Sequence, residues 1–158
     1  MHKYVIAYFI MPLKDSTVYV EENSPQHITL CQIYSMREKY VSSLLKELSK
    51  IAGCLTPISA VTEEKVMFGP NYDTPVIKIS IQSKLRDLHL QLVETVNKFN
   101  PTYDFPEYMG NGFQPHITLV NDLRIKGDIP ININSFTLLD CGLNDDLFVK
   151  VIRTFSFQ

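Results

Sequence analysis

The 158-residue sequence is poor in cysteine, in net charge and in long apolar runs, and each shortage excludes a class of protein. Its three cysteines are widely spaced and form no Cys-x-x-Cys pair, so neither a disulfide framework nor a zinc knuckle is indicated. With 15 basic and 17 acidic residues the formal charge is −2, which leaves no overall positive surface for a long polyanion. No apolar stretch approaches the roughly 20 residues needed to span a bilayer.

The hydrophobic content points to an ordinary globular protein. At 45% hydrophobic residues the chain has enough apolar material for one core, and no linker or low-complexity segment divides it. We therefore expect one domain over residues 1–158. The start, Met1-His2-Lys3-Tyr4, leads into a strand-like run, so we expect neither a signal peptide nor a membrane anchor. Together with the few cysteines, this favours the cytoplasm.

Apolar periodicity predicts two amphipathic helices, over residues 36–52 and 84–99, with Ser83 as the N-cap of the second. Runs rich in β-branched and aromatic residues predict strands. These strands are expected at residues 4–10, 27–33, 55–61, 65–68, 76–81, 116–120, 131–139 and 147–157, with a polar break at 62–64. The last two are expected to form an antiparallel pair joined near residues 142–145. Residues 100–114 are typical either of a mobile aromatic loop beside a site or of a loop packed on the core.

The most informative feature is a repeated tetrapeptide, His-Ile-Thr-Leu, at residues 27–30 and again at 116–119. Each copy lies in a predicted strand, follows a proline and a glutamine, and contains one of only four histidines. A single copy is explained by the solvated face of a half-buried strand, but the repetition favours a shared role. Side chains two apart in a strand share a face, so each copy presents one imidazole and one hydroxyl opposite its Ile and Leu anchors.

Two imidazoles brought to one place can form an acid/base pair. If an approximate two-fold axis relates the two halves, the motif strands lie side by side or face each other. Imidazole has an ordinary pKa near 6.5, so one member can be neutral while the other is protonated at neutral pH. A threonine hydroxyl beside each imidazole can donate a hydrogen bond to a phosphate oxygen.

The paired motif resembles that of the 2H phosphoesterase superfamily, which contains 2′-5′ RNA ligase-like proteins and RNA cyclic phosphodiesterases. The resemblance implies an α+β fold of two pseudo-symmetric lobes, each an antiparallel sheet with outer helices, with a central groove between them. It also implies that His27, Thr29, His116 and Thr118 are catalytic. In many relatives a basic residue closely follows the second motif, whereas Val120 and Asn121 stand here.

The resemblance further implies a metal-independent phosphodiesterase without a cofactor. One histidine would take a proton from the attacking oxygen and the other would protonate the departing ribose oxygen. The expected substrate is a nucleotide or short RNA carrying a 2′,3′-cyclic phosphate or a 2′-5′ linkage, and the sequence does not choose between these or assign the base and the acid. We expect a monomer with no obligate protein partner and no membrane association.

Other interpretations of the same residues stay open. The groove could bind a nucleotide or RNA without turnover, or His27, Cys31 and His116 could hold zinc, since Cys31 is two residues beyond Thr29 and is expected on its face. A ferredoxin-like regulatory domain also fits the helix and strand order, but it leaves the repeat unexplained.

The remaining candidates are single side chains. Tyr108 and Phe113 are expected to stack on a nucleobase or to pack in the core. His2 and His89 have no partner of the required kind in sequence and are expected to be incidental. The basic residues are expected to be solvated surface; these are Lys65, Lys78, Arg124 and Lys126.

Overall fold

The structure is a computed structural model that describes residues 1–119, 126–142 and 147–158. The end of the predicted strand 116–120, the Val120-Asn121 departure, Arg124 and most of the predicted turn at 142–145 lie outside the described residues. No helix in the described ranges is long and apolar enough to cross a membrane.

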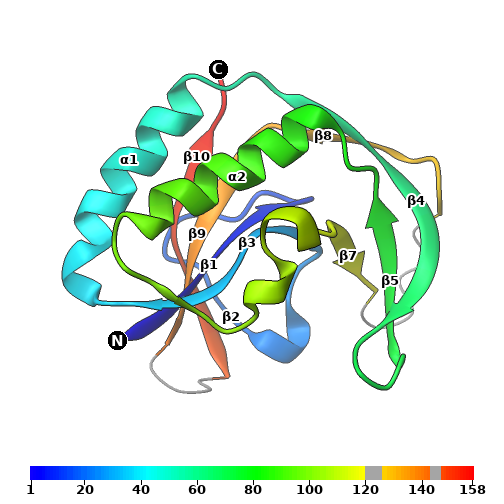
Figure 1. The fold of residues 1–158 in the computed structure, drawn as a ribbon, viewed down its shortest axis with the longest axis horizontal. Helices are drawn as coiled ribbons and strands as arrows, with labels where there is room; N and C mark the ends of the chain where they lie inside the picture. The colour runs from blue at the N-terminus through cyan, green and yellow to red at the C-terminus, as the bar shows by residue number, and fades with distance from the viewer. Residues whose placement is uncertain (120–125, 143–146) are drawn as a thin grey trace.

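The described strands form one antiparallel sheet of ten strands (Figure 1). In chain order the strands are β1 (His2–Phe9), β2 (Val18–Val20), β3 (His27–Met36), β4 (Ile58–Phe68), β5 (Thr74–Ile79), β6 (Thr102–Tyr103), β7 (His116–Thr118), β8 (Pro130–Ile133), β9 (Ser135–Gly142) and β10 (Phe148–Ser156). Their order across the sheet is β2-β10-β9-β1-β3-β7-β5-β4-β8, and β6 pairs with β3. The two motif strands, β3 and β7, are therefore neighbours at the centre of the sheet.

Two helices cover one face of this sheet, as Figure 1 shows. Helix α1 (Val41–Gly53) packs on β10, and α2 (Ser83–Asn97) packs on β3 and β4, while the helices also contact each other. The apolar stripes of both helices join the core-facing side chains of β3 and β7 in one buried cluster. Short 3-10 helices lie at Glu21–Asn23, Glu38–Tyr40, Pro106–Tyr108 and Gly110–Gly112.

The α+β class and the antiparallel sheet are confirmed, as is the pairing of β9 with β10. Several boundaries differ from the predictions. Helix α1 begins later than residue 36 because β3 continues to Met36, and the N-cap of α2 is Gln82 instead of Ser83. The predicted break at 62–64 is a register shift within the continuous β4, where the pairing passes from Thr62 to Lys65.

The predicted strand 131–139 is two strands with different partners. β8 pairs with β4 at one edge of the sheet, whereas β9, which starts two residues after β8 ends, pairs with β1 and β10. The chain thus passes from one half of the sheet to the other at Asn134. This crossing brings the C-terminal strands beside β1 and completes the half that contains β3.

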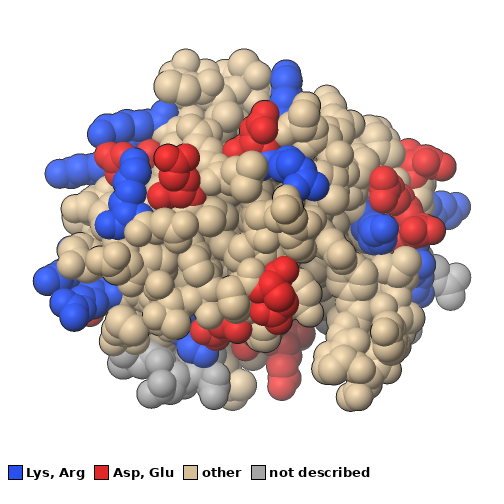
Figure 2. All heavy atoms as spheres, in the orientation of Figure 1, with Lys and Arg blue, Asp and Glu red and all other residues tan. Residues whose placement is uncertain are grey.

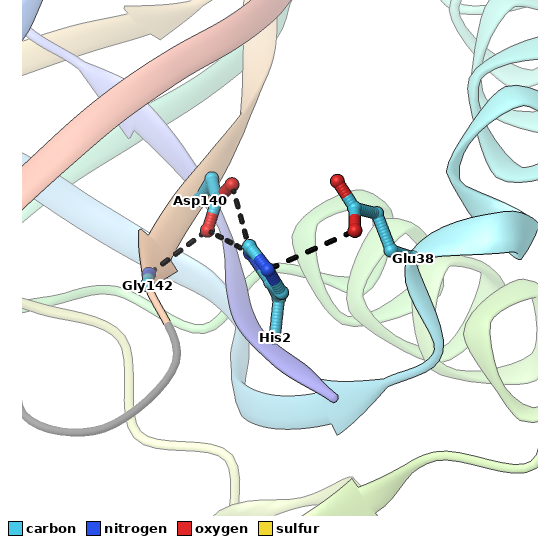
Figure 3. A network of polar contacts seen from close by, with 4 residues as sticks. All are labelled: His2, Glu38, Asp140 and Gly142. Atoms are coloured by element: carbon cyan, nitrogen blue, oxygen red, sulfur yellow. Dashed lines mark hydrogen bonds and ion pairs between the residues drawn. The ribbon is translucent and has the colours of Figure 1, made fainter.

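The N-terminal end of β1 is held by a polar network on this same half (Figure 3). The Nδ1 atom of His2 lies 3.3 Å from both carboxylate oxygens of Asp140 in β9, and its Nε2 lies 3.9 Å from Glu38. The backbone N–H of Gly142 donates to Asp140 at 2.8 Å. His2 is the register partner of Met36, which lies at the opposite end of β3 from His27. Its contacts therefore stabilise the sheet and are remote from the motifs.

A second, smaller apolar cluster lies on the opposite face of the sheet, away from the helices. It consists of Ala7, Phe9, Leu139, Val149 and Val151. Side chains from the segment between β1 and β3, including Leu13 and Tyr19, pack against it. This segment covers part of that face and forms a wall next to the first motif.

Candidate active site

The two motifs meet through a single pair of isoleucines. Ile28 of β3 and Ile117 of β7 are antiparallel register partners, and both are buried beneath the helices. In an antiparallel pair the neighbours of such partners are also opposite each other and share the other face. His27 therefore lies opposite Thr118, and Thr29 lies opposite His116.

The four polar side chains consequently occupy one patch on the sheet face away from the helices. The two strands are side by side in one sheet, and do not face each other across a gap. His27 and His116 are diagonal neighbours across the pair, a relation that places side chains about 7–8 Å apart. A phosphate group whose attacking and departing oxygens each hydrogen-bond one imidazole fits a separation of this order.

The same hydrogen bond orients both imidazoles. In His27 the Nδ1–H donates to the carbonyl of Pro25, and in His116 it donates to the carbonyl of Gln114, at 2.8 Å in each case. Ser24 Oγ lies 3.3 Å from the His27 Nδ1. Because a carbonyl only accepts, each bond keeps a proton on Nδ1 and leaves Nε2 as the atom available for proton transfer.

A phenylalanine packs against each imidazole. The ring of Phe9 lies 5.4 Å from that of His27, and the ring of Phe68 lies 4.9 Å from that of His116, measured between centroids. Each motif histidine thus has the same two neighbours: the carbonyl of the residue two positions before it, and the ring of a phenylalanine. This is the local pseudo-symmetry expected from the repeated tetrapeptide.

Burial disfavours the charged form of both histidines. Burial lowers the pKa of His27 and of His116, and the bond to the backbone carbonyl only partly offsets this. A positive charge on His116 lowers the pKa of His27 further, so the doubly protonated pair is disfavoured. An anion bound between the rings would favour the singly protonated pair that acid/base chemistry needs.

A cavity of ≈ 430 Å³ opens beside the patch, toward β1 and β9. His27, Thr29 and Thr118 line it, whereas His116 lies beside it and not in its wall. The polar part of the remaining wall comes from Lys3, Glu21, Ser24, Gln26 and Gln32, and the apolar part includes Val5, Ile33, Phe105, Leu139 and Val149. The wall carries charges of both signs and two aromatic rings, the half-buried Tyr19 and one exposed ring.

That ring belongs to Phe105, which the sequence did not distinguish from its neighbours. For Phe113 both base stacking and core packing were open, and its side chain packs in the core with an exposed fraction of 3%. Tyr108 is 48% exposed and lies beside Phe105, but it does not line the cavity. Phe105 itself is 47% exposed at the cavity wall.

Lys78, which was expected to be solvated surface, lies next to the second motif. It is the register partner of His116 in the β5–β7 pair, so it lies on the motif face beside that imidazole. Its Nζ is 3.7 Å from Glu64. Because this placement depends on the pairing of β5 with β7, which are distant in the sequence, no local pattern indicated it.

The zinc interpretation is contradicted by the position of Cys31. A register shift in β3 turns Cys31 to the core side, where it is fully buried opposite Ile6, and burial strongly raises the pKa of its thiol. It therefore cannot join His27 and His116 on the motif face. Among the residues that the structure describes, no group of three or more His, Cys, Asp or Glu side chains is arranged to hold a metal ion.

The chain is similar to known proteins in both sequence and fold. A family model described as the 2′-5′ RNA ligase superfamily matches residues 9–126. A protein of Oceanobacillus iheyensis named as a phosphoesterase is 32% identical over 100 residues, which cover 63% of this chain and 54% of that protein. The match thus spans about half the length of that relative.

Solved structures share the fold over nearly the whole chain. E. coli LigT complexed with 3′-AMP has a TM-score of 0.64 at 12% identity, covering 99% of this chain and 98% of LigT. The protein TT0787 of Thermus thermophilus has a TM-score of 0.60 at 17% identity, with coverage of 98% and 97%. The likeness to these structures shows the fold, and the family model, which spans both motifs, shows the family. The chain belongs to the 2′-5′ RNA ligase superfamily of 2H phosphoesterases.

Proposed function

We propose that this protein is a metal-independent phosphodiesterase in which His27 and His116 form the acid/base pair and Thr29 and Thr118 bind the phosphate. The substrate class is an RNA-derived phosphodiester, either a nucleoside 2′,3′-cyclic phosphate or a 2′-5′ linkage. Membership of a phosphoesterase family supports the hydrolysis of a phosphate ester. The finer assignment rests on the arrangement of the four side chains.

The observation that carries the proposal is the matched orientation of the two imidazoles. Each has its Nδ1 proton committed to a backbone carbonyl, so both present Nε2 on the same face of adjacent strands. A threonine hydroxyl lies directly across from each ring. A structural role on a solvated face would not require two histidines in the same tautomer beside two hydroxyls.

The chemistry follows from this arrangement. A neutral imidazole accepts the proton of the attacking oxygen at Nε2 while the protonated partner donates its Nε2 proton to the departing ribose oxygen. With water as nucleophile a 2′,3′-cyclic phosphate opens to a phosphomonoester. With the adjacent 3′-hydroxyl as nucleophile a 2′-5′ linkage is cleaved and a 2′,3′-cyclic phosphate forms. The threonine hydroxyls donate to the nonbridging oxygens, which gain negative charge in the transition state.

The cavity and the surface charge favour a small substrate. A space of ≈ 430 Å³ with both Lys3 and Glu21 in its wall suits one nucleoside better than a long strand. Figure 2 shows the helix-covered face, which is opposite the motif patch, and basic and acidic side chains are interspersed there. The formal charge of −2 from 15 basic and 17 acidic residues likewise provides no excess of positive charge for a long polyanion. E. coli LigT has been solved with 3′-AMP, NADP⁺ and ATP, which supports nucleotide-sized ligands for this fold.

The test is turnover in the presence of EDTA on a panel of 2′,3′-cyclic nucleotides, 2′-5′ and 3′-5′ dinucleotides and cyclic dinucleotides, with products identified by mass spectrometry. We expect hydrolysis of a 2′,3′-cyclic phosphate or a 2′-5′ linkage that EDTA does not reduce. Activity that EDTA abolishes and zinc or manganese restores would overturn the metal-independent mechanism. Binding of a nucleotide without any product would instead support a module that retains the groove without turnover.

A further inference from the structure

His89 was expected to be incidental because it lies between Leu88 and Leu90 in a helix, but the structure gives its ring two hydrogen-bond partners in distant segments. Its side chain is completely buried at the centre of α2. The ring Nδ1–H donates to the carbonyl of Leu30 at 2.7 Å, and Nε2 accepts the backbone N–H of Gly110 at 2.9 Å. The ring also stacks on Phe113, with centroids 3.9 Å apart and an angle of 2° between the planes.

The first of these bonds supports the strand that carries the first motif. The β1–β3 pairing passes from Ala7 opposite Thr29 to Ile6 opposite Cys31, so Leu30 is an extra residue without a partner on β1. A bulge of this kind leaves backbone groups outside the ladder, and the buried carbonyl of Leu30 needs a donor. His89 supplies that donor one residue after Thr29.

The second bond holds the segment that leads into the second motif. Gly110 belongs to the loop over residues 104–114, which places Phe105 in the cavity wall and ends at Gln114, whose carbonyl orients His116. The loop is tightly packed on itself, since a Cβ at Gly112 would clash with the carbonyl oxygen of Glu107. One imidazole thus anchors both the bulge after Thr29 and the loop before His116.

We propose that His89 is a positioning residue that fixes the two motifs and the wall containing Phe105 relative to one another. It lies on the helix side of the sheet and does not reach the substrate face. Its effect on the reaction rests on the proposed function, whereas its effect on the loop does not. The cavity wall and both motifs would therefore be held in place by the same buried side chain.

His89 can make both hydrogen bonds only when its ring is neutral. A protonated His89 carries a hydrogen on Nε2 and cannot accept the N–H of Gly110. Burial lowers the pKa of His89, and the charge of Arg86 one turn earlier on α2 lowers it further, against the opposing bond to Leu30. Of the acidic side chains on the loop, Asp104 pairs with Lys3 and Glu107 is exposed.

The first test compares His89→Phe with Val96→Ala by hydrogen–deuterium exchange. His89→Phe keeps an aromatic ring against Phe113 but removes both hydrogen bonds. Val96→Ala weakens the same helix through an apolar side chain two turns away that cannot hydrogen-bond to the loop. We expect exchange in residues 104–114 to accelerate about tenfold or more in His89→Phe only, as the loss of one hydrogen bond implies. Unchanged loop exchange in a folded His89→Phe protein would overturn the proposal.

A second measurement uses the unaltered protein, in case His89→Phe does not fold. The amide resonance of Gly110 should shift with the same apparent pKa as the His89 ring in an NMR titration, and an amide that ignores this titration would contradict the bond. On the best substrate of the panel, His89→Phe should lose about 10²-fold in kcat/KM through misplacement of the motifs. His89→Gln, which retains a donor and an acceptor, should recover part of this loss. If the wild-type protein turns over no substrate, the proposed function fails while the exchange and NMR results still decide the role of His89.

Discussion

Ile28 and Ile117 are opposite each other in adjacent antiparallel strands, with exposed fractions of 0% and 1%, directly beneath the motif residues. This contact joins the half of the sheet built from β2, β10, β9, β1 and β3 to the half built from β7, β5, β4 and β8. The spacing of the imidazoles therefore depends on how these two side chains pack. Function and core stability are coupled at this pair.

Truncating either isoleucine should destabilise the protein and loosen the site. We expect Ile28→Ala and Ile117→Ala each to lower the free energy of unfolding by about 2–5 kcal/mol, because each removes a buried side chain and leaves a cavity. The Ile→Val variants should cost about 0.5–1.5 kcal/mol and keep most activity. Urea denaturation measures the free energy of unfolding of all these variants. An Ile→Ala variant that loses less stability than the matching Ile→Val variant would contradict the central position of the pair.

Removing a threonine hydroxyl should slow the reaction without unfolding the protein. Thr29→Ala and Thr118→Ala each delete a hydrogen bond to a nonbridging oxygen, so we expect kcat to fall about 10–10³-fold. The anchors Ile28, Leu30 and Ile117 keep the strands in place, and circular dichroism should be unchanged. Thr29→Ser and Thr118→Ser, which keep the hydroxyl, are the matched controls and should retain more activity than the alanine variants.

The part of the site that depends on local sequence could be predicted. Alternation of side chains is a property of a single strand, so the face shared by His27 and Thr29 follows from their spacing. The helices likewise follow from apolar stripes within one segment. The adjacency of β3 and β7 joins residues far apart in the chain, and the sequence therefore left both a side-by-side and a facing arrangement open.

The features that the sequence did not predict lie where a local pattern is interrupted or where distant segments meet. The bulge at Leu30 moves Cys31 to the core side, although period-two alternation places it with Thr29. In the loop before the second motif, composition does not say which ring packs inward, so both base stacking and core packing were open for Phe113, and Phe105 was not singled out. The sequence did not reveal the contacts of His89, because both of its hydrogen-bond partners are backbone groups of segments far away in the chain.

Acidification should destabilise the protein below about pH 6.5. The pKa values of His27, His89 and His116 are all lowered in the folded state from the ordinary 6.5, mainly by burial. Between the folded and unfolded pKa values the unfolded chain binds more protons, so stability is full above 6.5 and is lost as the pH falls. The midpoints of urea denaturation at pH 7.5, 6.0 and 5.0 measure this loss of stability. His89→Gln removes one of the three titrating groups, so stability should depend less on pH in this variant. A midpoint that is constant or rises on acidification would contradict it.

The aromatic ring that contacts the substrate should be Phe105. Stacking of a base on an aromatic side chain is worth about 1–3 kcal/mol, so Phe105→Ala should raise KM by about 5- to 100-fold with a smaller change in kcat. Tyr108→Ala is the matched control, because Tyr108 is equally exposed on the same loop but does not line the cavity. Steady-state kinetics on one substrate compares the two. A larger effect at Tyr108 would show that the loop presents a different ring to the substrate.

The two histidines should behave as one catalytic unit. Replacing His27 or His116 by Ala removes one of two proton transfers, each of which typically contributes about 10²–10⁴-fold, and the local pseudo-symmetry predicts single losses of similar size. The double variant should lose much less than the product of the single losses, since one proton transfer without the other achieves little. Because a neutral base and a protonated acid are needed together, the wild-type rate should rise and then fall with pH. Kinetics of both single variants and the double variant, with circular dichroism to confirm folding, test this. Near wild-type turnover by a folded His27→Ala or His116→Ala protein would show that the repeated motif is structural.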